Sequence, residues 1–328
     1  MGDTTAASPA FLDWKVETDK ENIRDGAIEL RAKVAENLYR KNYDNPEKAR
    51  MRAQGPGFHW RINAVRKVEL MTGKKLSGKI IEVGAGTGVF TAELSREKEP
   101  EVIYCLDYDK YSVEELMPVV FKNLEADFTK IQTVLGSYNR MQVTDDFFDY
   151  IISLGAIHHS ENLLATFREA YRVLKPGGFL VASEHCHPNS YTQEEQRADY
   201  ERPLSRERLK TLYNDDKMHV KVKDNSDHYY RICEFEAYAY AAGFNVMPYV
   251  FDIDGEKIDD QIFRRPKPYS GYSSRTFFPY FAQDTKKPVF DNLLLILHKP
   301  VPGQPAAFTQ ELNFRKPPEK GFFSRLFK

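Results

Sequence analysis

Apolar and polar positions alternate in blocks between residues 79 and 184. Short apolar runs rich in Val, Ile and Leu are separated by longer segments in which apolar residues recur at helical spacing. The short runs predict five strands, over residues 79–83, 102–106, 131–135, 148–154 and 179–183. The longer segments predict helices over 89–96, 112–124 and 160–174, the last with Ser160 as its N-cap. Such alternation predicts an α/β fold with a mostly parallel sheet and helices on both faces.

The segments on either side of this block carry weaker patterns. Residues 1–76 have no clear strand pattern and predict helices near 23–43 and 60–71, so we expect a helical N-terminal extension. Beyond residue 184, the pattern predicts a helix at 233–242 and strands at 245–251 and 293–298. We expect a main domain over 77–300 with insertions at about 185–231 and 252–292, followed by a flexible linker and an amphipathic tip over 301–328.

Composition is that of a globular protein and excludes some functions. Of 328 residues, 41% are apolar and 29% charged, and 47 Lys and Arg nearly balance 48 Asp and Glu. This balance argues against bulk nucleic-acid binding, which needs a strongly basic surface. The three cysteines form no C-x-x-C pair, which argues against a disulfide framework or a cysteine zinc site. With no signal-peptide pattern and no apolar run of membrane length, we expect a cytoplasmic protein.

Three glycines follow the first predicted strand of the block at the spacing G-x-G-x-G, as Gly84, Gly86 and Gly88. A strand that ends in such a turn leaves bare backbone for a ligand, and the next helix directs its amide groups toward that ligand. The dinucleotide pattern G-x-G-x-x-G differs in its last step. Asp107, which ends the second predicted strand, could accept hydrogen bonds from the two hydroxyls of a ribose, or it could cap the following helix.

Residues 79–184 resemble the class I S-adenosylmethionine-dependent methyltransferases. Five segments in order carry the resemblance, at residues 82–88, 106–107, 148–153, 156–159 and 174–180. The resemblance implies a Rossmann-like sheet of seven strands, with the strand at 293–298 antiparallel, and S-adenosylmethionine as the cofactor. It also implies an enzyme that transfers a methyl group.

The resemblance assigns a role to each residue near the glycine turn. It implies that Glu82 and the turn face the methionine end of the cofactor, and that Asp107 holds the ribose. The family often has an acidic residue at the adenine, where this chain has Ser137 instead. The expected cofactor-binding residues are Glu82, Gly84, Ala85, Gly86, Gly88, Asp107, Tyr108, Ser137, Leu154 and Gly155.

Methyl transfer from a sulfonium needs in-line placement, and a base when the acceptor is a hydroxyl or an ammonium. His158, His159 and His185 follow the fourth and fifth predicted strands of the block and are the catalytic candidates, although one of the adjacent pair could be structural. The spacing of His185 and His187 permits a metal, but without a clear further ligand we expect none. The expected acceptor-binding residues are His187, His228, Arg264, Arg265, Tyr269, Tyr272 and Arg275, the last five in a segment that could equally be a solvated basic loop.

The predicted function is methyl transfer to a polar, preferably anionic, small molecule or glycan, with oxygen favoured over nitrogen as the acceptor atom. Rival hypotheses are a non-catalytic cofactor-binding scaffold and a nicotinamide-dependent oxidoreductase. Residues 320–328 place Phe and Leu side chains beside Lys and Arg, so this tip could make weak contact with a membrane surface or a protein. The tip could also fold back onto its own domain.

Overall fold

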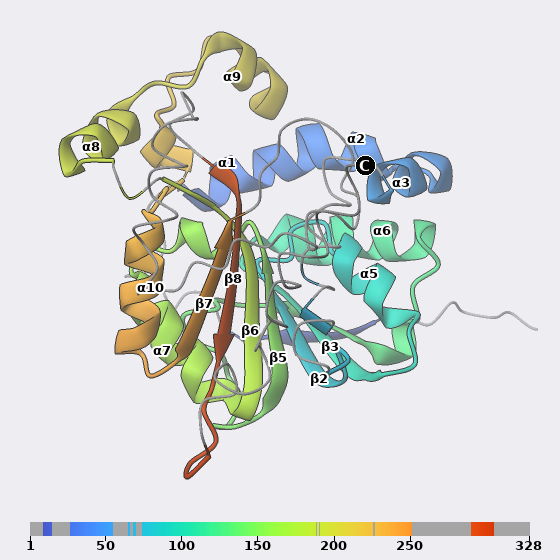
Figure 1. Ribbon diagram of the computed structural model, residues 1–328. Helices are drawn as coiled ribbons and strands as arrows, with labels where there is room; N and C mark the ends of the chain where they lie inside the picture. Colours follow the sequence, from blue (N-terminus) through green and yellow to red (C-terminus); the bar gives the residue numbers. More distant parts are fainter. Residues whose placement is uncertain are drawn as a thin grey trace, which may run out of the picture.

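The computed structural model describes residues 9–14, 27–54, 65, 68–69, 74–187, 189, 191–225, 227–250 and 290–304. Within these residues, one sheet of eight strands forms the centre and helices cover both of its faces (Figure 1). The strands are β1 (Ala10–Asp13), β2 (Gly78–Val83), β3 (Pro100–Asp107), β4 (Ile131–Leu135), β5 (Phe148–Leu154), β6 (Leu174–Cys186), β7 (Asn245–Val250) and β8 (Phe290–His298). The predicted α/β Rossmann-like architecture is therefore confirmed.

Helical segments fill the connections between the strands. Those before β2 are α1 (Ala27–Val34), η2 (Ala35–Tyr39), α2 (Arg40–Tyr43) and α3 (Pro46–Ala53). Those between β2 and β6 are α5 (Val89–Ser95), η3 (Ser112–Leu116), α6 (Met117–Asn123), η4 (Phe128–Lys130), η5 (Ile157–His159) and α7 (Leu163–Val173). Those after β6 are α8 (Gln193–Glu201), α9 (Arg206–Tyr213), η6 (Val222–Asn225) and α10 (Ile232–Ala241). None of the described helices is both long and apolar enough to cross a bilayer.

The strand order is β1-β4-β3-β2-β5-β6-β8-β7. Neighbouring strands from β1 to β6 pair in parallel, whereas β8 is antiparallel to both β6 and β7. The expected antiparallel strand is thus confirmed. The order reverses at β2, so the glycine turn that follows β2 lies at the switch point where such sheets bind ligands.

Two expectations for the N-terminal part and α7 are wrong. β1 pairs with β4 at the sheet edge, so the described sheet has eight strands rather than seven and residues 1–76 are not helical throughout. A four-residue edge strand is too short for alternation to reveal it in the sequence. The N-cap of α7 is Asn162, whose side chain accepts from the Ala165 amide, while Ser160 bonds to Thr166.

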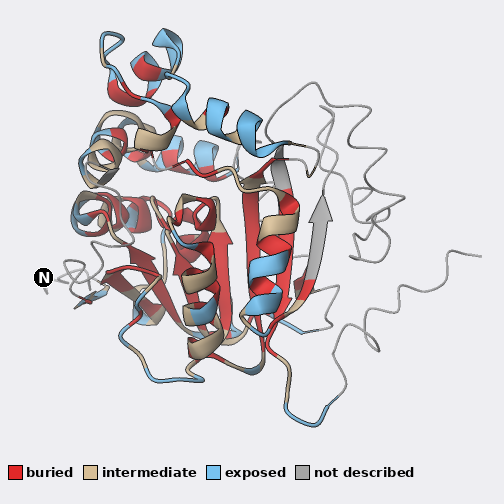
Figure 2. Ribbon diagram, turned by 90° about the vertical axis from the view of Figure 1, so that its left-hand side faces the viewer, coloured by how far each residue is buried: buried red, intermediate tan, exposed pale blue. Residues whose placement is uncertain are grey.

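The core forms two hydrophobic layers, one on each face of the sheet. One layer contains Ile80, Ile103 and Ile152 and packs against α5 and α6. The other contains Ile81 and Ile151 and packs against α7 and α10. Figure 2 shows the sheet as the most buried part of the protein, with exposed residues on the outer helix faces. Two apolar layers explain why the central strands are apolar on both faces.

A third, smaller cluster joins segments that are far apart in the sequence. Val34 of α1 packs with Leu209, Leu212 and Tyr213 of α9. Figure 1 shows α1, α2 and α9 together at the same end of the sheet. This contact fixes the N-terminal helices and the segment after β6 above the strand ends, where the candidate site lies.

Candidate functional site

A cavity of about 1210 Å³ lies beside the glycine turn. Its walls come from the turn after β2, the ends of β3, β5 and β6, the N-terminal helices and α9. The π-helical turn η2 contributes Ala35, Leu38 and Tyr39. One cavity therefore combines the predicted cofactor residues with residues from two covering segments.

The three glycines of the turn have different roles. All have positive φ angles, at +61° for Gly84, +54° for Gly86 and +72° for Gly88. A Cβ at Gly84 would lie 2.3 Å from Ala156 Cβ, and one at Gly88 would lie 2.6 Å from a ring carbon of Phe121. A Cβ at Gly86 would meet no atom within 4 Å. Gly84 and Gly86 line the cavity and Gly86 borders open space, whereas Gly88 serves packing and the start of α5.

Asp107 ties the glycine turn to the end of β3. Its carboxylate accepts hydrogen bonds from the Gly86 amide at 2.7 Å and the Asp109 amide at 2.9 Å. Burial raises the pKa of Asp107 to about 6, although these bonds oppose the rise. Asp107 lines the cavity with Tyr108. Asp109, rather than Asp107, binds the amide and hydroxyl of Ser112 at the next helix, so the alternative capping role belongs to Asp109.

Glu82 and Ser137 do not line the cavity, contrary to the contacts expected for them. The Glu82 carboxylate is buried and accepts from the amide and hydroxyl of Thr91, at 3.0 and 2.6 Å. Burial raises its pKa to about 7. Ser137 accepts from the Asn139 amide at 3.1 Å. Glu82 thus fixes α5 beneath the turn. Tyr138, the residue after Ser137, lines the cavity instead of Ser137. The cavity is also lined, as expected, by Ala85, Leu154 and Gly155.

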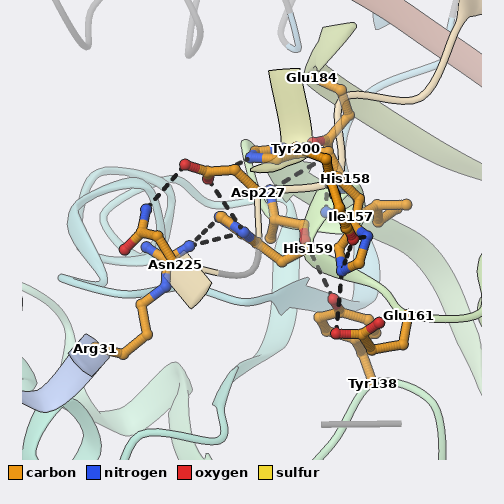
Figure 3. Close-up of polar contacts among 12 residues, drawn as sticks. Arg31, Tyr138, Ile157, His158, His159, Glu161, Glu184, Tyr200, Asn225 and Asp227 are labelled. Carbon is orange, nitrogen blue, oxygen red and sulfur yellow. Dashed lines mark hydrogen bonds and ion pairs between the residues drawn. The ribbon is translucent and has the colours of Figure 1, made fainter. Parts of the chain in front are cut away.

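The opposite part of the cavity holds a histidine cluster, formed by His158, His159 and His185 with Tyr229 beside them. Figure 3 shows the polar contacts of His158 and His159. The ring centroid of His158 lies 4.0 Å from that of His159 and 4.8 Å from that of His185. Tyr229 stacks on His158 at 6.0 Å. The three predicted catalytic candidates therefore converge on one place.

His158 is held between two carboxylates. Its Nδ1 lies 2.7 Å from Glu184 Oε2, and its Nε2 lies 3.8 Å from Asp227 Oδ1. Burial alone would lower the pKa of His158, but the hydrogen bonds to Asp227 and Glu184 outweigh it and raise the pKa. With both ring nitrogens directed at carboxylates, His158 is positioned to carry a proton rather than to accept one from a ligand.

Glu184 organises the loop that follows β5. Besides His158, its carboxylate accepts from the Ser153 hydroxyl at 2.5 Å and from the Ile157 amide at 3.1 Å. Burial would raise the pKa of Glu184, but the contact with His158 and these bonds lower it overall. An ionised Glu184 thus orients the His158 side chain toward the cavity wall.

Arg31 and Asp227 both lie close to the His159 ring. The Arg31 guanidinium donates to the His159 ring, and His159 Nδ1 lies 3.5 Å from Asp227 Oδ1. Both ring nitrogens of His159 lie within reach of the guanidinium, which only donates, so one of them accepts from Arg31. Burial would raise the pKa of Asp227, but His158, His159 and Arg31 hold it well below the usual range. The sequence carried no signal for either residue, because neither belongs to a motif.

His158, His159 and Asp227 also have the spacing of a metal site. One ligand atom from each lies within 4.8 Å of the others, and two imidazoles with a carboxylate suit a divalent ion. However, the Arg31 guanidinium already contacts His159 and acts on Asp227. A second cation would be repelled there, so the donor set does not fit a resident metal while Arg31 is in place.

Two of the expected acceptor-binding residues lie away from the cavity. His187 stacks on Tyr191 at 4.2 Å, and its Nε2 lies 3.8 Å from Asp199. His228 bonds to Tyr200, and its Nε2 lies 3.1 Å from Glu161. Neither lines the cavity, so both hold the segment after β6 together. Arg264, Arg265, Tyr269, Tyr272 and Arg275 lie outside the described residues.

The methyltransferase domain family matches residues 81–182, the stretch that contains the glycine turn, Asp107 and the adjacent histidines. Residues 81–182 form a class I S-adenosylmethionine-dependent methyltransferase domain. S-adenosylmethionine is the cofactor of this class, so the sequence-based prediction of the family and its cofactor is confirmed for this domain. The oxidoreductase hypothesis has no support from these matches.

Named relatives of the domain act on different compounds. A demethylmenaquinone methyltransferase from Staphylococcus saprophyticus is 30% identical over 133 residues, covering 40% of this chain and 53% of that protein. A sterol 24-C-methyltransferase from Aspergillus fumigatus is 28% identical over 119 residues, covering 36% of this chain and 31% of that protein. The chain thus spans about half or less of the curated relatives it matches.

Among solved structures, phosphoethanolamine N-methyltransferase 2 from Haemonchus contortus, in complex with S-adenosyl-L-methionine, resembles the chain at 15% identity and a TM-score of 0.48. The similarity covers 77% of this chain and 56% of that one.

Proposed function

We propose that the whole chain transfers the methyl group of S-adenosylmethionine to a polar small molecule or glycan, on oxygen in the first place and on nitrogen in the second. One observation carries this proposal: the glycine turn with Asp107 and the histidine cluster line the same cavity. A methyl donor at one end and an acceptor at the other would then meet without leaving the protein, which is the placement that the reaction needs.

The cavity wall suits the cofactor. Bare backbone at Gly86 borders open space, and the Asp107 carboxylate beside it can accept from vicinal ribose hydroxyls. Pockets that bind small molecules and cofactors measure about 300–1,000 Å³. At about 1210 Å³, the cavity has room for the cofactor and for an acceptor beside it. When bound, S-adenosylmethionine supplies an electrophilic methyl group on a good leaving group.

The histidine cluster suits a hydroxyl acceptor. His158 has a carboxylate at each ring nitrogen and acts as a positioning residue. We assign the base to His185, or to His159 once an acceptor hydroxyl displaces Arg31 from its ring nitrogen, since both line the cavity and neither is held between two carboxylates as His158 is. Either ring would take the hydroxyl proton as the oxygen attacks the methyl group.

The segment after β6 acts as an acceptor-recognition cover in this proposal. Arg208, Thr211 and Leu212 of α9 line the cavity, as do Asn225 and Asp227. Most of these side chains are polar, which supports a polar acceptor. The relatives named for a quinone and a sterol support a small-molecule acceptor in the general sense only.

Calorimetry and a labelled methyl donor test the proposal. S-adenosylhomocysteine should bind with micromolar affinity and NAD should not bind. With labelled S-adenosylmethionine, the wild type should label an acceptor from a panel of sugars, phenols and amines. His159→Gln and His185→Gln should be compared. The variant that lacks the base should lose turnover and keep its affinity for the cofactor. Binding of NAD but not of S-adenosylhomocysteine would overturn the proposal.

A further inference from the structure

Three arginines line the cavity in the described part of the chain, and their surroundings differ. Arg31 donates to His159 and acts on Asp227. Arg52 donates to the side-chain oxygen of Asn42 at 2.9 Å. Within the described residues, no hydrogen bond or ion pair engages the guanidinium of Arg208, an exposed residue on α9. Arg208 is therefore a cavity-lining cation whose charge the surrounding side chains leave uncompensated.

Arg208 belongs to the acceptor end of the cavity. Arg208 and Tyr229 line the same cavity, and the positive charge of Arg208 opposes the rise that burial causes in the pKa of Tyr229. Tyr229 in turn stacks on His158. The next residue, Leu209, packs with Val34 of α1, so the helix that carries Arg208 is firmly docked. Arg208 therefore lines the cavity from a helix whose backbone is fixed against the N-terminal helices.

The charges at the acceptor end do not cancel. Protonated His158 lies between the carboxylates of Glu184 and Asp227, and Arg31 acts on Asp227, so two positive charges face two negative ones. Arg208 adds one positive charge to this balanced set. The cofactor end instead carries the carboxylates of Asp107 and Asp109. An anionic group on an acceptor is therefore favoured beside Arg208.

We propose that the methyl acceptor carries a carboxylate or phosphate group, and that Arg208 binds this group and directs a neighbouring hydroxyl toward the histidine cluster. The planar guanidinium fork matches either oxyanion through paired hydrogen bonds. This inference rests on the proposed function, because it names the substrate class of the same site. Arg208 acts as a specificity-determining residue in it and takes no part in the chemical step.

The test uses the full-length chain and small anions as probes, because the acceptor is unidentified. Inorganic phosphate is titrated by ³¹P NMR and acetate by ligand-observed ¹H NMR, each with and without saturating S-adenosylhomocysteine. Arg208→Gln is compared with Arg206→Gln, a matched control on the same helix that does not line the cavity. Arg208→Lys tests whether charge alone suffices, and thermal unfolding checks that each variant is folded.

We expect at least one anion to bind about tenfold more weakly to Arg208→Gln than to the wild type, with Arg206→Gln unchanged and Arg208→Lys intermediate. The affected anion then tells phosphate from carboxylate. Equal anion affinity in the wild type and in Arg208→Gln, or an equal loss in Arg206→Gln, would overturn the inference. S-adenosylhomocysteine binding is measured separately, so its absence would count against the proposed function whatever the anions do.

Discussion

Replacing Asp107 by alanine should weaken cofactor binding without unfolding the protein. In the free protein its carboxylate accepts from the Gly86 and Asp109 amides. In the complex it would accept from the ribose, and a hydrogen bond to a charged group contributes about 1.5–3 kcal/mol. Losing one such bond should raise the Kd of S-adenosylhomocysteine by roughly 10- to 150-fold.

Stability should respond to this substitution in a different way. The pKa of Asp107 rises from an ordinary 3.8 to about 6 on folding. Because the folded state holds this proton more tightly, the wild type loses stability as pH rises from about 4 to about 6. About two pKa units correspond to roughly 3 kcal/mol. Asp107→Ala should lack this slope and should not be markedly less stable than the wild type at pH 8.

Two measurements separate these effects: calorimetric titration with S-adenosylhomocysteine at pH 8, and urea unfolding repeated from pH 4 to pH 8. Asp127→Ala is the control, because it removes a capping aspartate outside the cavity. A Kd within twofold of the wild type would refute the ribose role of Asp107. A loss of affinity that merely follows a loss of folded protein would refute it as well.

Three further outcomes are expected. The pKa of His158 is raised on folding, so its contribution to stability is complete below about pH 6.5 and is lost as pH rises through the raised pKa. In urea unfolding, the stability of His158→Gln should therefore approach that of the wild type at high pH. A difference in stability that stays constant with pH would contradict this. Glu82→Gln should make the free energy of unfolding less sensitive to pH between about 4.5 and 7, because ionisation of Glu82 opposes folding in that range. If stability depended on pH as steeply in Glu82→Gln as in the wild type, the pKa of Glu82 would not be raised. Chelation of metals by EDTA should leave the rate of methyl transfer within twofold of its starting value. When Co²⁺ is added, Arg31→Met should show the absorption bands of bound Co²⁺, which the wild type should lack. Metal-dependent turnover of the wild type would show that Arg31 does not exclude a metal.

The sequence alone was sufficient for strands β2 to β6, for the glycine turn and for Asp107. Apolar runs over β2 to β6 and the glycine spacing depend on neighbours within a few residues, so they are legible without a structure. Asp107 was found for the same reason, since it ends a predicted strand. The roles of Glu82 and Ser137 could not be predicted from the sequence, because the direction of a side chain depends on packing. Glu82 bonds to Thr91 and does not line the cavity.

Only the tertiary structure assembled the acceptor end. The histidines were visible as candidates, but Arg31 comes from α1 and Asp227 from the segment after η6, and their contacts with His159 span long stretches of chain. The docking of α9 on α1 brought Arg208 to the cavity, and β1 joined the sheet through pairing with β4. Local periodicity records how a segment faces its nearest core, whereas contacts between distant segments depend on how the whole chain packs, and no pattern of neighbouring residues contains that information.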